Sequence, residues 1–211
     1  MNVETRLSPY FSAIPETDIP DVLQPVARLR DGFGASTLRV VVFGGARNGK
    51  SSLINALSGA EMLPVHSLGP GHPIVELRHD TDPRASIVRA DGTEAEVSID
   101  EGRRIARGIV EAVTRITMWA PFPFLSDNVA LVDTPPLTGG DGADEWAIMT
   151  ELESADIALM VLSADKILSR SERELARRAG RLLGDNMWFV VNRIDLVEES
   201  ELDEVMAWAA G

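Results

Sequence analysis

Cysteine is absent from the 211 residues of this chain. Its absence excludes a disulfide, a thiolate metal site and a cysteine nucleophile, and it is compatible with a reducing compartment. The first residues lack a basic stretch followed by an apolar one, so we expect no secretion signal. No apolar run approaches the roughly 18 residues that a membrane-spanning helix needs. We therefore expect a cytoplasmic location.

Positive charge is scarce as well, because 33 acidic residues outnumber 20 basic ones and the formal net charge is −13. A surface of this sign disfavours nucleic acid and anionic lipid as direct partners. We interpret the basic pairs at 103–104 and 177–178 as solvated helix faces rather than binding sites. The composition is 45% hydrophobic, which is enough for one α/β domain with a buried core.

One glycine-rich segment indicates the class of ligand. Residues 44–51 read GGARNGKS, which matches the phosphate-binding pattern G-x-x-x-x-G-K-[ST], and they directly follow the apolar run 38–43. In such a loop, backbone N–H groups bind phosphate oxygens at the start of a helix. The lysine, here Lys50, contacts the β- and γ-phosphates, and the hydroxyl of Ser51 binds Mg²⁺. We predict a nucleoside triphosphate contacted by Gly44, Gly45, Ala46, Arg47, Asn48, Gly49, Lys50, Ser51 and Ser52.

Two further motifs follow apolar runs. The run 128–132 ends at Asp133, a position from which a carboxylate holds Mg²⁺, usually through water. The run 188–191 leads into residues 192–195, NRID, in which an aspartate can accept from the ring N–H and the amino group of guanine. Adenine lacks this donor pair, so we predict GTP or GDP as the nucleotide. The predicted metal ligands are Ser51 and Asp133, and the predicted base contacts are Asn192, Arg193 and Asp195.

Alternating strand and helix patterns predict the fold class. A P-loop NTPase is expected, with a doubly wound, mainly parallel sheet and helices on both faces. We divide the chain into an irregular or helical segment at 1–37, with a short helix near 18–31, and a GTPase domain at 38–211. The expected strands are 38–43, 74–77, a hairpin at 85–99 around Asp91 and Gly92, 114–119, 128–132, 156–162 and 187–191. The expected helices are 50–58, 99–112, 143–153, 170–183 and 199–209, and Trp119 and Trp188 are expected in the core.

Taken together, these motifs resemble the GTPase domain of dynamin-like large GTPases, bacterial ones especially, over about residues 38–207. The resemblance rests on residues 44–59, LPV at 63–65, WAPFPFL at 119–125, LVDTP at 131–135, LSAD at 162–165 and VNRID at 191–195. It implies GTP-driven self-association through the nucleotide face, as a homodimer or as a heterodimer of paralogues, linked to membrane remodelling. It also implies that lipid is contacted only by regions absent from this sequence, and that the full-length protein lies at the inner face of the cell membrane.

Four features depart from the family pattern. Residues 66–73 contain no threonine, which the family uses to hold Mg²⁺ and the attacking water. Pro136 stands where the family has a glycine whose N–H meets the γ-phosphate, and proline has no N–H. Arg193 replaces a lysine beneath the base, so we expect weaker guanine binding. The family's last strand and helix are not found before Gly211, which predicts a truncated domain.

The remaining site residues leave several functions open. Arg47 stands where related guanylate-binding GTPases carry an internal arginine finger, so the resemblance implies that it acts in catalysis with Lys50; the alternative is a solvated arginine at the loop rim. Two functions are therefore open. The chain is a slow GTPase, or it is a degenerate GTPase that does not hydrolyse GTP and acts as a scaffold or as the partner of an active paralogue. A small ribosome-assembly GTPase is a third possibility, although no basic RNA-binding surface is evident. The three histidines match no metal motif and are expected at the surface: His66, His72 and His79.

Overall fold

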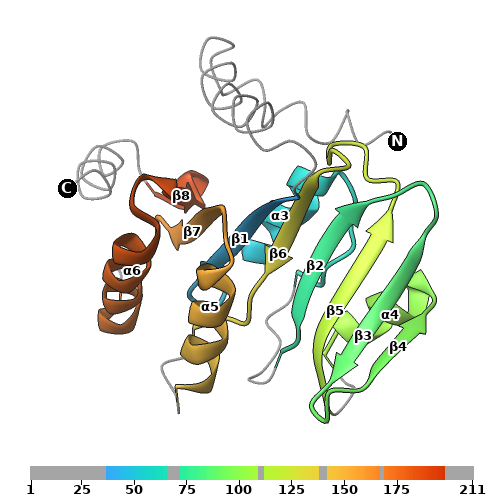
Figure 1. Ribbon diagram of the computed structural model, residues 1–211. Coiled ribbons are helices and arrows are strands. Elements are labelled where there is room, and N and C mark those ends of the chain that lie inside the picture. The colour runs from blue at the N-terminus through green and yellow to red at the C-terminus, as the bar shows by residue number, and fades with distance from the viewer. Residues whose placement is uncertain (1–36, 66–71, 109–111, 138–141, 167–168, 198–211) are drawn as a thin grey trace. The chain divides into compact units, whose positions relative to one another are not determined.

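The computed structural model describes residues 37–65, 72–108, 112–137, 142–166 and 169–197. These residues form an eight-stranded sheet in the order β4-β3-β5-β2-β6-β1-β7-β8 (Figure 1). Its strands are β1 (Leu38–Gly44), β2 (Ile74–His79), β3 (Arg84–Arg89), β4 (Glu94–Val97), β5 (Val113–Ala120), β6 (Val129–Asp133), β7 (Ile157–Ser163) and β8 (Met187–Asn192). The helices are α3 (Lys50–Ser58), α4 (Ile99–Ala106), α5 (Ala143–Glu153) and α6 (Arg170–Leu183), with the 3-10 turns η1 (Gly184–Asn186) and η2 (Ile194–Leu196). The helices predicted near 18–31 and at 199–209 lie outside the described residues.

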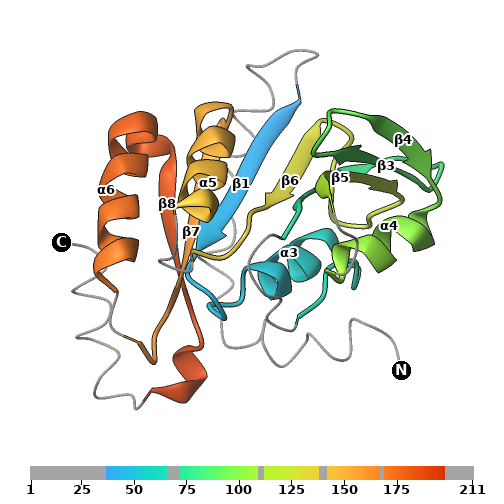
Figure 2. The same ribbon diagram turned by 90° about the horizontal axis from the view of Figure 1, so that it is seen from below.

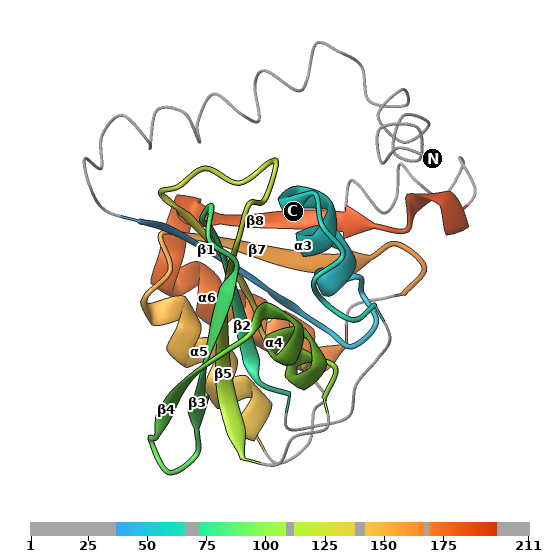
Figure 3. The ribbon, with the colours of Figure 1, turned by 90° about the vertical axis from the view of Figure 1, so that its right-hand side faces the viewer.

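The parallel half of the sheet is centred on β1. This strand pairs in parallel with β6 on one side and with β7 on the other, and β8 follows β7 in parallel. Its residues are almost all apolar and buried, as expected for a parallel strand that is covered on both faces. Val41 and Phe43 pack into one cluster with Ile148 of α5 and Leu175 of α6. The side view shows α5 and α6 on this face and α3 on the opposite one (Figure 3).

The other half of the sheet is mostly antiparallel. Strand β2 is parallel to β5 but antiparallel to β6, and β3 is antiparallel to both β5 and β4. The predicted hairpin is confirmed, because β3 and β4 are joined around Gly92, whose φ is 80°. Helix α4 packs on β3 and β5, where Gly102 allows close approach to Ala85. The sheet is therefore mixed, and its parallel half carries the three nucleotide motifs.

Three sequence expectations differ from the structure. Helix α4 ends at Ala106 rather than at residue 112, because Gly108 adopts a φ of 95° that a helix cannot continue through. Trp119 is half-buried rather than in the core, and the Arg84 guanidinium lies 4.7 Å from the centre of its ring. Trp188 is also half-buried, and its indole N–H donates to the carbonyl of Asp185 at 3.1 Å. Both tryptophans therefore lie at the margin of the core.

A buried ionic network crosses the sheet on the α5 face. Glu76 of β2 and Glu151 of α5 are each no more than 4% exposed. Arg39 of β1 and Arg115 of β5 each pair with both carboxylates, and Arg78 adds a third contact to Glu76. The network joins three strands to one helix. Within the described residues, no helix is long and apolar enough to cross a membrane.

Candidate nucleotide site

The phosphate loop leaves the carboxyl end of β1 and leads into α3 (Figure 2). Gly44 and Gly49 have φ values of 140° and 97°, which L side chains rarely adopt. A methyl group at Gly44 would overlap the carbonyl of Val161, and one at Gly49 would overlap the amide of Asn192. The loop therefore needs glycine at both positions. The first residues of α3, Lys50 to Ser52, line the cleft above the loop, and a helix start leaves N–H groups without partners within the helix.

Lys50 is held inside this loop. Its Nζ donates to the carbonyl oxygens of Gly44 at 3.2 Å and of Gly45 at 3.0 Å. Burial lowers the pKa of Lys50, and the negative charge of Asp133 opposes that effect. A buried ammonium beside free N–H groups is suited to an anionic ligand, and the polyphosphate of a nucleotide fits this donor set.

Ser51 and Asp133 meet beside Lys50. The Ser51 hydroxyl donates to Asp133 Oδ2 at 2.8 Å, while Asp133 Oδ1 is buried with no hydrogen-bond partner among the described residues. Burial raises the pKa of Asp133 to about 6, against the opposing effects of the Lys50 charge and the Ser51 hydrogen bond. A hydroxyl and an unsatisfied carboxylate oxygen are ligands that a hydrated Mg²⁺ accepts. The two predicted metal ligands thus lie together and fit that ion.

Asn48 ties the loop to three other elements. Its Nδ2 donates to the carbonyl of Val161 in β7 at 2.9 Å and to Glu172 Oε1 in α6 at 3.0 Å. The backbone carbonyl oxygen of Asn48 accepts a hydrogen bond from Asn192 Nδ2 at 2.9 Å. Glu172 also closes a capping box with Ser169 at the start of α6. Sequence analysis missed the contact of Glu172 with the loop, because the S-x-x-E pattern signals only a helix start.

The third motif lies at the end of β8. Asn192 Oδ1 accepts from the backbone N–H of Arg193 at 2.9 Å, and the Arg193 guanidinium lies 3.8 Å from Asp165 Oδ2. Asp195 is exposed in η2. The structure therefore brings Asn192 against the phosphate loop, while the carboxylate predicted to read guanine faces solvent. Recognition of the base by these residues stays a prediction.

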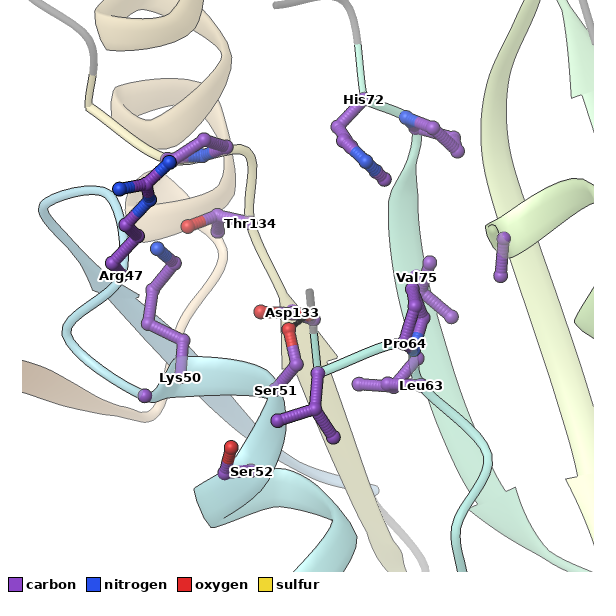
Figure 4. A pocket seen from close by; sticks show the side chains of 15 residues that line it. Arg47, Lys50, Ser51, Ser52, Leu63, Pro64, His72, Val75, Asp133 and Thr134 are labelled. Carbon is purple, nitrogen blue, oxygen red and sulfur yellow. Dashed lines mark hydrogen bonds between the residues drawn. The ribbon is translucent and has the colours of Figure 1, made fainter. Parts of the chain in front are cut away.

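A cleft opens between the phosphate loop and β2 (Figure 4). Of the predicted site residues, it is lined by Arg47, Gly49, Lys50, Ser51, Ser52 and Asp133. Gly44, Gly45, Ala46 and Asn48 form the rest of the loop, and the base motif does not line the cleft. Arg47 is exposed and has a φ of 63°, a position at the rim of the loop.

His72 lines the same cleft and contradicts the expectation of a surface histidine. It is half-buried, and its Nε2 is buried without a partner among the described residues. Sequence reasoning missed it because the spacing of the histidines carries no signal of this contact. Within the described part of the chain, no group of three or more histidine, aspartate or glutamate side chains is arranged to hold a metal ion.

Comparison with known proteins identifies the family. The sequence pattern of the dynamin family matches residues 40–194. The chain belongs to the dynamin family. It is 26% identical to dynamin-like protein 2 of Campylobacter jejuni, over 82% of this chain and 28% of that protein. It is 29% identical to the isoniazid-induced protein IniA of Mycobacterium tuberculosis, over 77% of this chain and 27% of that protein. It is also 26% identical to mouse mitofusin-2 over 90% of this chain and 26% of that one.

A solved structure supports the fold of this dynamin-family domain. It belongs to an oligomerised bacterial dynamin pair described in relation to sensing and tethering of membranes. The two structures agree with a TM-score of 0.63 at 24% identity, over 83% of this chain and 28% of the other. The expected P-loop GTPase fold is thus confirmed. The chain spans about a quarter of the length of the relatives described here.

Proposed function

We propose that this domain binds GTP and GDP with Mg²⁺ and hydrolyses GTP slowly. The observation that carries the proposal is the arrangement of Lys50, Ser51 and Asp133, in which a buried ammonium lies beside a hydroxyl and an unsatisfied carboxylate oxygen. Family membership implies a guanine nucleotide. The cleft combines a buried cation, the N–H groups of a helix start and a carboxylate suited to Mg²⁺. Few ligands other than a nucleotide with Mg²⁺ match all three.

Each residue has a defined task in this proposal. Lys50 and the amino end of α3 bind the phosphates, and Ser51 and Asp133 hold the ion directly and through water. Mg²⁺, when bound, neutralises charge that develops on the phosphates. Asn192 and Asp195 select guanine, and the alkyl part of Arg193 packs beneath the base. Gly44, Gly45, Ala46 and Gly49 provide the backbone that encloses the phosphates.

Arg47 is proposed to assist hydrolysis from within the loop. It lines the cleft, and its side chain is not fixed by a buried partner in the part of the chain that the structure describes. An arginine that contacts the transferred phosphoryl group stabilises its charge, so Arg47→Ala should lower the turnover rate at least tenfold. The GDP affinity should change less than threefold, because the contact forms in the transition state. If the variant and the wild type hydrolyse GTP at the same rate, Arg47 is a solvated residue at the rim of the loop and takes no part in hydrolysis.

Calorimetric titration tests the proposal directly. GDP and a non-hydrolysable GTP analogue, each with Mg²⁺, should bind the purified chain, and ADP should bind at least tenfold more weakly. Lys50→Ala should abolish nucleotide binding, whereas Arg177→Ala, which removes an exposed charge from α6, should not change it. A folded wild-type sample that binds no guanine nucleotide at high concentration refutes the proposal.

A second function is favoured by Pro136, which lines the cleft without a backbone N–H to offer. The domain would then be a GTPase-like scaffold, or the inert partner of an active paralogue, that binds nucleotide but does not hydrolyse it. Turnover that is present in the wild type and absent in Lys50→Ala decides against this reading. The match to the dynamin family speaks against a ribosome-assembly GTPase.

In the whole protein, we propose nucleotide-dependent self-association of this domain, as a homodimer or with a paralogue, linked to membrane remodelling. The solved relative is an oligomerised bacterial dynamin pair, which motivates the pairing. Membrane contact is assigned to regions outside this sequence, because the net charge of −13 repels anionic lipid. The proposed location is cytoplasmic, at the inner face of the cell membrane.

A further inference from the structure

Two buried polar atoms in the cleft lack partners within the described residues. One is Asp133 Oδ1, and the other is Nε2 of His72. Buried polar groups in proteins nearly always have a hydrogen-bond partner, so two such atoms in one cleft indicate that a ligand completes them. Their chemistry differs, because a carboxylate oxygen accepts and an imidazole nitrogen can donate. The proposed Mg²⁺ and its water account for Asp133, and they leave His72 unexplained.

His72 lies on the wall of the cleft that faces the phosphate loop. Its imidazole points into the gap between that loop and β2 (Figure 4). The lining of the cleft outside the phosphate loop is poor in donors, because Pro64, Pro73 and Pro136 have no N–H and the Thr134 hydroxyl donates to the carbonyl of Val42 at 3.0 Å. Among the described residues of this lining, His72 has a side-chain nitrogen that no protein group uses and that can donate.

The charges around the ring indicate what approaches it. Burial lowers the pKa of His72, and the positive charge of Lys50 lowers it further against a smaller opposing effect of Asp144. The imidazole and the Lys50 side chain also line the same cleft. A terminal phosphate held by Lys50 on one side presents its remaining oxygens to the opposite wall. An imidazole N–H is a suitable donor to such an oxygen.

We propose that His72 donates a hydrogen bond from Nε2 to the terminal phosphate of the triphosphate and thereby distinguishes GTP from GDP. This inference rests on the proposed function. His72 is a specificity residue for the nucleotide state, and it supplies from the β2 side the donor that Pro136 cannot supply. GDP, which lacks the terminal phosphate, gains nothing from it.

Titration of GDP and a non-hydrolysable GTP analogue into histidine variants tests the inference. A hydrogen bond to a charged phosphate is worth about a ten- to hundredfold change in affinity, so His72→Ala should weaken the analogue by that factor. The GDP affinity should change less than about threefold on the same comparison. His72→Gln, whose amide nitrogen reaches the place of Nε2, should retain most of the preference, and His72→Asn, whose amide lies nearer the place of Nδ1, should not.

His79→Ala is the matched control, because His79 lies outside the cleft and its Nδ1 is 2.8 Å from the carbonyl oxygen of Phe122. It should leave both affinities unchanged. A wild-type chain that binds neither nucleotide removes the proposed function and this inference together. If the wild type binds both ligands, one outcome overturns this inference alone. In that outcome His72→Ala leaves the ratio of the two affinities unchanged, either because neither affinity falls or because both fall equally.

A second measurement observes the imidazole in the wild-type chain. Long-range ¹H–¹⁵N spectra report the protonation and hydrogen bonding of each imidazole nitrogen, and the chain has only three histidines. The signals of His72 are those missing from the spectrum of His72→Gln. The analogue should shift the Nε2 signal of His72 in the direction of a stronger donor, and GDP should not. Equal shifts with the two nucleotides overturn the proposal.

Discussion

Pro136 removes a backbone donor from the wall of the cleft. Pro136→Gly restores an N–H there, and a hydrogen bond to a charged phosphate contributes about 1.5–3 kcal/mol. The variant should therefore bind a GTP analogue at least tenfold more tightly relative to GDP, as measured by calorimetry. In a His72→Ala background, it should recover part of the lost preference. Pro83→Gly, at an exposed turn, controls for the added flexibility of glycine. If the ratio of the affinities for the analogue and for GDP is unchanged in Pro136→Gly, residue 136 does not meet the terminal phosphate.

Gly49 allows a separate test of the phosphate loop. Gly49→Ala forces a left-handed backbone on alanine, at about 1–2 kcal/mol, and pushes its methyl group into the Asn192 amide. Gly92 has a similar φ of 80° but no neighbour within 4 Å, so Gly92→Ala shows the strain alone. Gly49→Ala should lose more stability than Gly92→Ala in urea unfolding, because the clash adds to the strain, and only Gly49→Ala should weaken GDP binding, by tenfold or more. Matching GDP affinities would mean that the link between Asn192 and the loop is not needed.

The residues of the phosphate loop could be assigned from sequence because each has a task that only certain residue types perform there. Gly49, Lys50 and Ser51 are recognisable at a fixed spacing after a strand. His72 could not be assigned, since its contact with the cleft depends on where β2 enters the sheet. Glu172 is similar, because its contact with Asn48 joins segments that are 124 residues apart in the chain.

At the scale of elements, the buried ionic network ties α5 to β1 and β5. Glu151→Ala leaves Arg39 and Arg115 with one carboxylate fewer in a buried setting, which typically costs about 3–5 kcal/mol. Urea unfolding should show this loss at neutral pH. Glu153→Ala, two residues along the same helix and exposed, should cost less than about 0.5 kcal/mol. If Glu151→Ala also lowers the free energy of unfolding by less than about 0.5 kcal/mol, the network contributes little to stability.

The same network gives a prediction for acid. Burial raises the pKa of Glu76, but hydrogen bonds and charges from Arg39 and Arg78 outweigh it and hold that pKa below its usual 4.5. A carboxylate with a lowered folded pKa contributes stability that is complete above the unfolded pKa and is lost as the pH falls through the folded one. The wild type should therefore lose stability below pH 4.5 more steeply than Glu76→Gln, measured by urea unfolding at several pH values. Parallel curves would contradict this.

Most element positions follow from local pattern, and their pairing does not. The apolar runs that became β1, β6 and β7 were predicted to within a few residues, because parallel strands buried on both faces are continuously hydrophobic. The run of β8 was also predicted, although this edge strand is only half-buried. The antiparallel pairing of β2 with β6 was not predicted, since strand direction is set by connections rather than by composition. The end of α4 was misplaced for a local reason, the positive φ of Gly108.

For the whole molecule, we propose that the cleft links nucleotide binding to self-association. A dimer that forms over the nucleotide face and buries the terminal phosphate must bind the triphosphate state more tightly than the monomer does, because coupling between two binding equilibria is reciprocal. Sedimentation velocity should show a monomer without nucleotide or with GDP, and a dimer with a saturating non-hydrolysable GTP analogue. Lys50→Ala should remain monomeric with the analogue. The affinity for the analogue should also rise with protein concentration. A dimer whose analogue affinity does not depend on protein concentration would be formed by a surface unconnected to the nucleotide.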